Sequence, residues 1–274
     1  ENFTALLNIH MRDLDGTARL FRANIVESGS NEIRDDFKRD EVALDGGNEQ
    51  TVNEHGGVLT MDYEMDKYTL TSVTGLESAN IYSRGDIDGG WGAAFLGSSG
   101  PGVIPFPSES ADGIPKLQQL TQELRLSSKY DGAVNFQAGV FIFDEDLEID
   151  TFNYDTLGGG VKDGDAHQEQ QTSAKAIFGT LDFQVTDDFK ASGGMRYSDE
   201  TKDFTAERTM TPFGGANLDL ISMSRDADFV SWDVNGLYTV NADMNVYGRA
   251  ARGFRAPSFQ GRVLFSDAVT VGET

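Results

Sequence analysis

Apolar and polar side chains alternate along most of the chain, so that every second residue is hydrophobic. In the series from Val134 to Ile142, for example, the even positions are apolar and the polar residues Asn135 and Gln137 lie between them. A period of two is the spacing of side chains on one face of a β-strand. The pattern therefore predicts an all-β chain with about ten strands, at residues 2–12, 17–27, 55–64, 67–84, 117–130, 133–149, 169–185, 189–204, 229–240 and 243–254.

The connections between the predicted strands alternate between two length classes. Short connections are rich in Asp, Asn or Gly, which accept tight turns, and lie at residues 13–16, 64–66, 131–132, 186–188 and 241–243. Long connections lie at residues 28–54, 85–116, 150–168 and 205–228. Long strands with short turns at one end and long loops at the other are typical of an antiparallel, up-and-down transmembrane β-barrel wall. A soluble β-sandwich also has period-two strands, but its connections do not usually alternate in length.

The same alternation assigns side chains to the two faces of the predicted wall, because neighbouring residues point in opposite directions. We expect the apolar positions of each strand to face lipid and the polar positions to face the lumen. The residues expected to face lipid are Val134, Phe136, Val140, Trp232, Val234 and Tyr238, and those expected to face the lumen are Asn135, Gln137, Asp233 and Asn235.

Composition removes several classes of function. The 274 residues include 22 Lys and Arg against 45 Asp and Glu, giving a formal net charge of −23. A chain this acidic lacks the basic face that nucleic acid requires, so we expect no nucleic-acid partner. The absence of cysteine excludes disulfides, zinc–thiolate sites, iron–sulfur clusters and thiol nucleophiles. No apolar stretch approaches the length of about 20 residues needed for a transmembrane helix.

The sequence offers no catalytic constellation, and we expect no enzyme, no catalytic residue and no cofactor. The serine-containing turn of α/β-hydrolases, GxSxG, is absent. Residues 13–16, 86–90 and 163–167 contain aspartates with spacings that faintly resemble calcium-binding loops. They lack the downstream glutamate of such loops and are read as turns or solvated loops, so we predict no metal site.

Two groups of residues are candidates for contact with a ligand. Three arginines follow one another near the end of the last predicted strand, where guanidinium groups near an extracellular mouth could pair with an anionic ligand or with neighbouring carboxylates. Three aromatic residues lie in the longest predicted loop and could contact a ligand or pack the loop on itself. The candidates are Arg249, Arg252 and Arg255, and Trp91, Phe95 and Phe106.

Several segments resemble the β-barrel of TonB-dependent outer-membrane receptors. These segments are "TQELRLSS" at 121–128, "FQAGVFIFDED" at 136–146, "IFGTLDFQVTDDFKASGGMRYSDETKDF" at 177–204 and "NVYGRAARGFRAPS" at 245–258. The most family-specific part is "GFRAPS", which consists of Gly253, Phe254, Arg255, Ala256, Pro257 and Ser258.

The resemblance implies a 22-stranded barrel around a plug domain in the bacterial outer membrane. It implies active import of a scarce small molecule, such as a ferric siderophore, powered by the TonB energy-transducing complex acting on the plug. Within this pattern we expect residues 1–274 to be a partial barrel domain without the plug and the C-terminal strands, open as an isolated fragment. The alternatives are a passive porin or structural outer-membrane barrel and, third, a soluble β-sandwich binding module.

Overall fold

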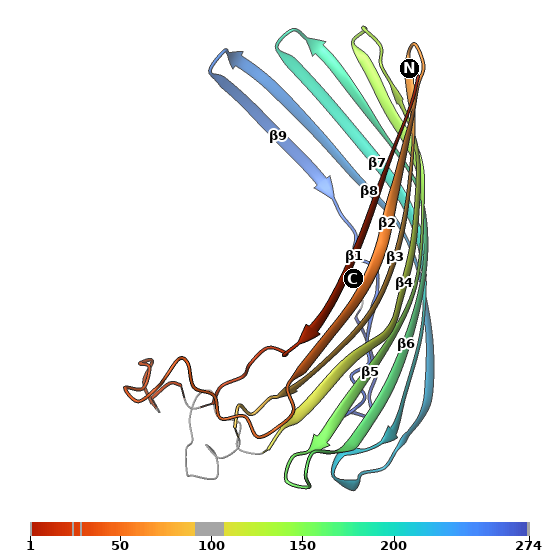
Figure 1. The fold of residues 1–274 in the computed structure, drawn as a ribbon. Helices are drawn as coiled ribbons and strands as arrows, with labels where there is room; N and C mark the ends of the chain where they lie inside the picture. Colours follow the sequence, from red (N-terminus) through yellow and green to blue (C-terminus); the bar gives the residue numbers. More distant parts are fainter. Residues whose placement is uncertain (1, 24, 28, 91–106, 273–274) are drawn as a thin grey trace.

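The computed structural model describes residues 2–23, 25–27, 29–90 and 107–272, which are dominated by one curved antiparallel sheet (Figure 1). Each strand of this sheet is hydrogen-bonded to the next in chain order. The described strands are β1 (Phe3–Gly16), β2 (Glu49–Glu64), β3 (Tyr68–Asp86), β4 (Glu109–Ser128), β5 (Val134–Asp155), β6 (Val161–Thr186), β7 (Phe189–Met210), β8 (Leu218–Asn241) and β9 (Met244–Arg252). This order confirms the predicted all-β, up-and-down architecture.

Among the described residues, a short 3-10 turn and a small ribbon lie outside the large sheet. A single 3-10 turn, Pro212–Gly214, connects β7 to β8, and a two-stranded ribbon is formed by β10 (Ser258–Gln260) and β11 (Thr270–Gly272). In the part of the chain that the structure describes, no helix is long and apolar enough to cross a membrane.

The prediction of a strand at residues 17–27 is wrong. The large sheet accordingly has nine described strands instead of the ten predicted. β1 continues through the predicted turn at 13–16, because Asp13 to Gly16 pair with residues 50–53 of β2. Cross-strand pairing outweighs the local turn preference of Asp and Gly in this segment. Residues 17–48 then form one long connection, in which the only described bridge joins Val26 and Ile33.

The other long connections are shorter than predicted, because the strands continue beyond their apolar parts. Residues 156–160 connect β5 to β6 and residues 211–217 connect β7 to β8, where the pattern had predicted loops at 150–168 and 205–228. Charged residues interrupt the apolar series in these segments, whereas the cross-strand pairing continues, for example between Asp150 and His167.

The two faces of the sheet differ in burial. Ala166, Ala176 and Phe204 are buried on one face, whereas Ile177 and Tyr197 are exposed on the opposite face. The buried face is the concave one, because the C-terminal segment lies in the hollow of the sheet (Figure 1) and packs there. The small core of the described residues is formed at this contact, by Ala166, Phe204, Ala206, Val263 and Leu264.

The convex face carries an apolar band with a sloping edge. On β7 the last apolar residue of this face is Tyr197, which Asp199 follows, whereas on β1 the apolar series continues to Met11. The strand pairings align Tyr197 with Ala5 of β1, so the edge shifts by roughly six residues over six strand steps. This shift corresponds to strands inclined by roughly 35° to the normal of the band, close to the tilt of strands in membrane barrels.

Candidate functional site

One candidate site is a pocket of about 400 Å³ on the concave face. Arg249 and Arg252 of β9, both predicted as ligand contacts, line it together with Arg125 of β4 and Arg196 of β7. β9 pairs with residues 232–241 of β8, the half that leads into the turn, and Arg252 is opposite Trp232. The two predicted arginines therefore lie midway along the sheet, not at the long-connection end where the ligand mouth was expected.

Arg196 is held by aromatic rings. Its guanidinium carbon lies 5.0 Å from the centre of the Phe141 ring and 5.8 Å from that of Phe178, at distances typical of cation–π contacts. Its Nε donates a hydrogen bond to Ser198 Oγ at 3.0 Å. Among the described residues, Arg196 forms no ion pair with a carboxylate. The other guanidinium N–H groups therefore have no partner of opposite charge in this part of the chain.

Arg252 has a similar environment at the edge of the sheet. Its guanidinium carbon lies 4.6 Å from the centre of the Phe229 ring, and that ring stacks on Phe254 at a centroid distance of 4.8 Å. Its side chain also forms no ion pair within the described residues. Arg252 is therefore a second arginine that is supported by aromatic rings and has no carboxylate partner.

The pocket contains two carboxylates, and each has an arginine partner. Glu123 Oε1 accepts a hydrogen bond from Arg125 Nη1 at 3.0 Å, and Asp233 Oδ2 lies 3.6 Å from Arg249 Nε. Three arginines of the concave face and Arg252, which is opposite Trp232 of the convex face at the edge of the sheet, thus line a pocket with two carboxylates. The pocket is locally cationic in a chain whose formal net charge is −23.

The family-specific motif at residues 253–258 leaves the sheet and crosses the concave face. Phe254 contributes the stacked ring described above, and the carbonyl oxygen of Pro257 accepts a hydrogen bond from Lys202 Nζ at 3.1 Å. Phe259 then stacks on Phe204 with the ring centroids 5.1 Å apart. Arg255, the third predicted arginine, is exposed and does not line the pocket. The motif therefore acts as a strap across β7 and β8.

A second polar cluster holds the long-connection end together. The Glu109 carboxylate is 1% exposed and accepts hydrogen bonds from Arg84 Nε at 2.6 Å and from the backbone N–H of Gly47 at 2.7 Å. The Arg84 guanidinium also lies 3.6 Å from the centre of the Tyr154 ring. These contacts join the connection 17–48 to the ends of β3, β4 and β5. Their chemistry is that of a structural anchor.

Asp86 and Asp88 lie within this end of the sheet, and their ligand atoms and that of Asp45 are within 4.8 Å of one another. Both buried carboxylates accept backbone hydrogen bonds, Asp86 from Asp45, Gly46 and Gly89, and Asp88 from Gly90 and Ser108. Burial raises the pKa of Asp88 to about 6. The segment predicted as a turn thus uses its aspartates to order the connections.

His167 lies between two carboxylates on β6, near the same end. Its Nδ1 is 2.6 Å from Asp150 Oδ1 and its Nε2 is 3.3 Å from Glu169 Oε1. Burial lowers the pKa of His167, but the hydrogen bonds and charges of Asp150 and Glu169 outweigh this effect and raise it overall. The arrangement stabilises a charged imidazolium in a strand extension and does not resemble a catalytic base.

The residues predicted to face lipid share the convex face. The pairings place Phe136 and Val234 in one row and Val140 in a row with Val230. Of the six residues, only Phe136 is half-buried, and the others are exposed. Asn135 and Asn235 lie in a row of the opposite face. That the convex face meets lipid stays a prediction.

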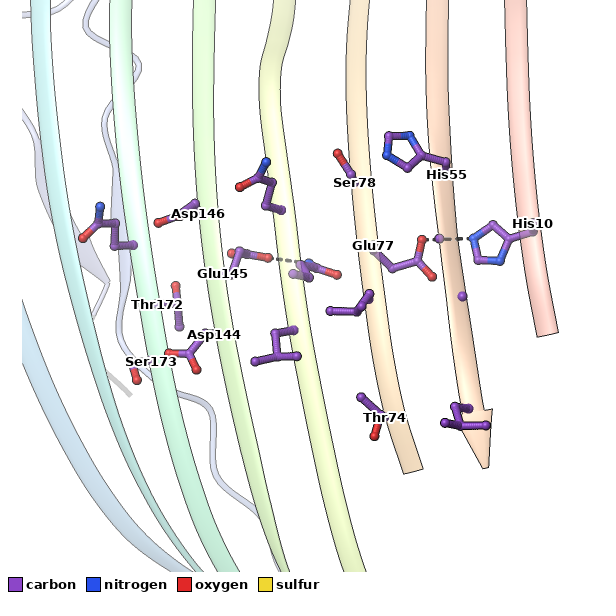
Figure 2. A pocket seen from close by; sticks show the side chains of 18 of the residues that line it. His10, His55, Thr74, Glu77, Ser78, Asp144, Glu145, Asp146, Thr172 and Ser173 are labelled. Carbon is purple, nitrogen blue, oxygen red and sulfur yellow. Dashed lines mark hydrogen bonds and ion pairs between the residues drawn. The ribbon is translucent and has the colours of Figure 1, made fainter. Parts of the chain in front are cut away.

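A broad groove of about 1090 Å³ crosses β1 to β7 near the sloping edge of the apolar band. Most of its lining side chains belong to the convex face, with Leu7, Ile9 and Met11 at one end and Asp144 and Asp146 towards the other. Figure 2 shows this region, including the ion pair between His10 and Glu77 that passes across β2. The groove follows the change from apolar to polar side chains on this face.

The remaining predicted contacts, Trp91, Phe95 and Phe106, lie outside the described residues. Sequence reasoning missed Arg125 and Arg196, although both stand at polar positions of alternating strands. Their meeting depends on pairings that run through β4, β5, β6 and β7. The alternation indicated their face, but not their proximity.

The fold defines the class of the protein: part of the wall of a membrane β-barrel, apolar on its convex face and polar within. A sequence model of the family described as TonB dependent receptor-like, beta-barrel matches residues 10–272. The chain therefore belongs to this family of bacterial outer-membrane transporters, which are not enzymes. This match confirms the resemblance drawn from the sequence. A search of curated proteins finds no match.

Solved structures of uptake receptors share the fold. The ferric yersiniabactin uptake receptor FyuA from Yersinia pestis has a TM-score of 0.72 at 13% identity, over 94% of this chain and 36% of the receptor. The ferric-catecholate import receptor Fiu from E. coli K12, in its open form, has a TM-score of 0.62 at 17% identity, over 91% and 44%. The siderophore receptor PiuA from Acinetobacter baumannii has a TM-score of 0.63 at 11% identity, over 94% and 40%. The chain thus spans less than half the length of each receptor.

Proposed function

We propose that the chain forms part of the barrel wall of a TonB-dependent receptor that actively imports a scarce small molecule, such as a ferric siderophore, into the periplasm. The family match over residues 10–272 is the observation that carries this proposal. The likeness to three siderophore receptors supports the choice of ligand class. In this proposal the remaining strands and the plug belong to parts of the receptor outside residues 1–274, and the plug transmits the action of the TonB complex.

The division of the sheet into two ends supports a direction of transport. The connection between β1 and β2 meets the ends of β3 and β4 at one end of the sheet, where Asp86 and Glu109 accept hydrogen bonds from the backbone of residues 45–47, and tight turns lie at the other end. Long loops of membrane barrels face the outside of the cell. Ligand capture then belongs to the long-connection end, and the lumen-facing polar side chains line the route inward.

Energy dependence tests the proposal. Cells that produce the full receptor should accumulate a radiolabelled ferric siderophore, and an uncoupler of the proton gradient should abolish accumulation but leave surface binding intact. A strain without the receptor gives the background for both measurements. A passive porin, the main alternative, would continue to admit solute after the gradient collapses, so uptake that is independent of the gradient would exclude the receptor proposal.

A further inference from the structure

We propose that the concave-face pocket lined by Arg125, Arg196, Arg249 and Arg252 is a binding site for a carboxylate-bearing anion on its way through the receptor lumen. The inference rests on the proposed receptor function, because it assigns a chemical class to the imported molecule. It does not depend on the loops that capture the ligand first.

The donor geometry of the pocket suits carboxylates. A guanidinium group is planar and presents two parallel N–H donors to the two oxygens of a carboxylate. Arg196 uses Nε for Ser198, and its ring contacts with Phe141 and Phe178 engage the face of the guanidinium group. The N–H groups at its rim remain available for an acceptor in the pocket.

The backbone supports this placement of Arg196. Arg125, Gly139, Phe178 and Arg196 lie in one row across β4 to β7. A Cβ atom on Gly139 would come within 2.5 Å of Phe178 Cζ and 2.8 Å of the carbonyl oxygen of Leu124. Glycine at this position therefore lets the Phe178 ring lie over β5, where it supports the guanidinium group.

Ion pairs with acidic residues of the chain do not neutralise the charges of Arg196 and Arg252 in the described region. The chain has 45 acidic residues, so nearby carboxylates are plentiful. Glu123 and Asp233 nevertheless pair with Arg125 and Arg249, and the two arginines on aromatic rings are left without carboxylates in the described region. The excess of positive charge in the pocket is the feature that a carboxylate-bearing ligand would neutralise.

Binding of radiolabelled citrate to the full-length receptor in detergent tests this inference. We expect salt-sensitive binding by the wild type and a loss of affinity of about tenfold or more in Arg196→Gln, because an ionic hydrogen-bonded pair is removed. Arg196→Lys should recover part of the affinity, since lysine keeps the charge but not the fork. Lys175→Gln on the convex face makes the same change in charge and should bind as the wild type does.

Several outcomes would overturn the inference. These are an absence of citrate binding by the wild type, an equal loss in Lys175→Gln, and unchanged affinity in Arg196→Gln. The last is also the result expected if acidic side chains of another receptor segment occupy the pocket. If Arg196→Gln fails the electrophoretic test for a heat-modifiable, folded barrel, Arg252→Gln at the sheet edge takes its place with the same expectation.

Transport is measured in a separate assay from citrate binding at the pocket. Gradient-dependent uptake of a neutral ferric trihydroxamate by cells that carry Arg196→Gln would uphold the receptor function whatever the result with citrate. Uptake of this chelate without a gradient would contradict the receptor function, whereas unchanged citrate affinity would contradict the anion site alone.

Discussion

At the scale of single residues, the same amino acid serves different purposes on neighbouring strands. Gly139 is required by its surroundings, because a side chain there would meet the Phe178 ring and the backbone oxygen of Leu124. Gly179, one row away on β6, has its nearest contact for an added Cβ at 3.4 Å, with the carbonyl oxygen of Gln137. A β-strand tolerates alanine where such space exists, so only Gly139 is constrained by close packing.

Alanine substitutions should separate the two glycines. Gly139→Ala should lower the free energy of unfolding of the full receptor by about 1–3 kcal/mol, because the added methyl group overpacks a site bounded by backbone. Gly179→Ala should change it by less than about 0.5 kcal/mol and serves as the matched control. Guanidinium unfolding in detergent, followed by tryptophan fluorescence, measures both; equal effects would contradict the packing argument.

At the scale of elements, each strand has an apolar part and a solvated part, and different interactions hold them. Between the turns and the sloping edge, the convex face is mainly apolar, and the described pairings shift register only beside two of the turns. Beyond the edge, buried polar groups such as Glu109 and Asp86 join the strand ends to the connections. This end of the sheet is therefore the part whose packing responds to protonation.

The contacts of Asp88 with Gly90 and Ser108 should loosen as the pH rises. Burial raises the pKa of Asp88 from 3.8 in the unfolded chain to about 6, so the folded state binds the proton more tightly. The resulting stabilisation is complete below about pH 4 and is lost as the pH rises through about 6. Hydrogen-exchange protection of the Gly90 and Ser108 amides should be higher at pH 5 than at pH 8.

Asp88→Asn is the matched variant for this measurement. Asparagine keeps an acceptor oxygen but does not titrate, so the change in protection between pH 5 and pH 8 should disappear. A wild-type receptor with equal protection at the two pH values, after correction for intrinsic exchange, would contradict the assignment to Asp88.

The sequence pattern located the strands where one face is apolar and failed elsewhere. From Val134 to Ile142 every even position is apolar and the stretch lies within β5, whereas residues 150–155, which begin and end with aspartate, were read as loop and extend the same strand. Asp13 to Gly16 has good turn composition and nevertheless pairs with β2. The period of apolar residues reports which strand face is buried, and turn propensity reports the local backbone preference. The ends of these strands depend instead on pairing between segments that are distant in the sequence.

The candidate site was predicted only in part for the same reason. Arg249 and Arg252 stand three positions apart on one strand, where alternation predicts opposite faces, so the sequence did not predict that both line one pocket. Arg125 lies 71 positions from Arg196 along the chain, yet three successive pairings bring them into one row. An error of one residue in any of these pairings would move a side chain to the opposite face.

At the scale of the whole molecule, the convex apolar band and its sloping edge indicate how the wall sits in a membrane. If the edge is level with the bilayer surface, the strands cross the bilayer at an angle of roughly 35°. The polar concave face then lines the lumen, where the arginine pocket and the strap at 253–258 lie. Each face thereby meets the medium that its composition requires.

Arginine scanning of one strand tests this orientation. Val140→Arg should reduce the folded yield of the full receptor strongly, because charge on the lipid side near the bilayer centre costs about 2–4 kcal/mol. Gln137→Arg on the opposite face of β5 should have little effect. Heat-modifiable migration of outer-membrane fractions measures the folded yield, and similar losses in both variants would contradict the assignment of faces.

In the proposed orientation, the strand extensions also determine what the receptor presents outside the cell. β5 continues for roughly twelve residues from Asp144 to Asp155, about 35 Å of pleated backbone along the tilted axis, before its connection to β6. In that orientation the external rim at β5 and β6 is a collar of paired strands and not a free loop. An antibody against this collar on intact cells should recognise a conformational epitope that depends on strand pairing. A linear peptide from the same residues should therefore elicit few antibodies that bind the folded collar.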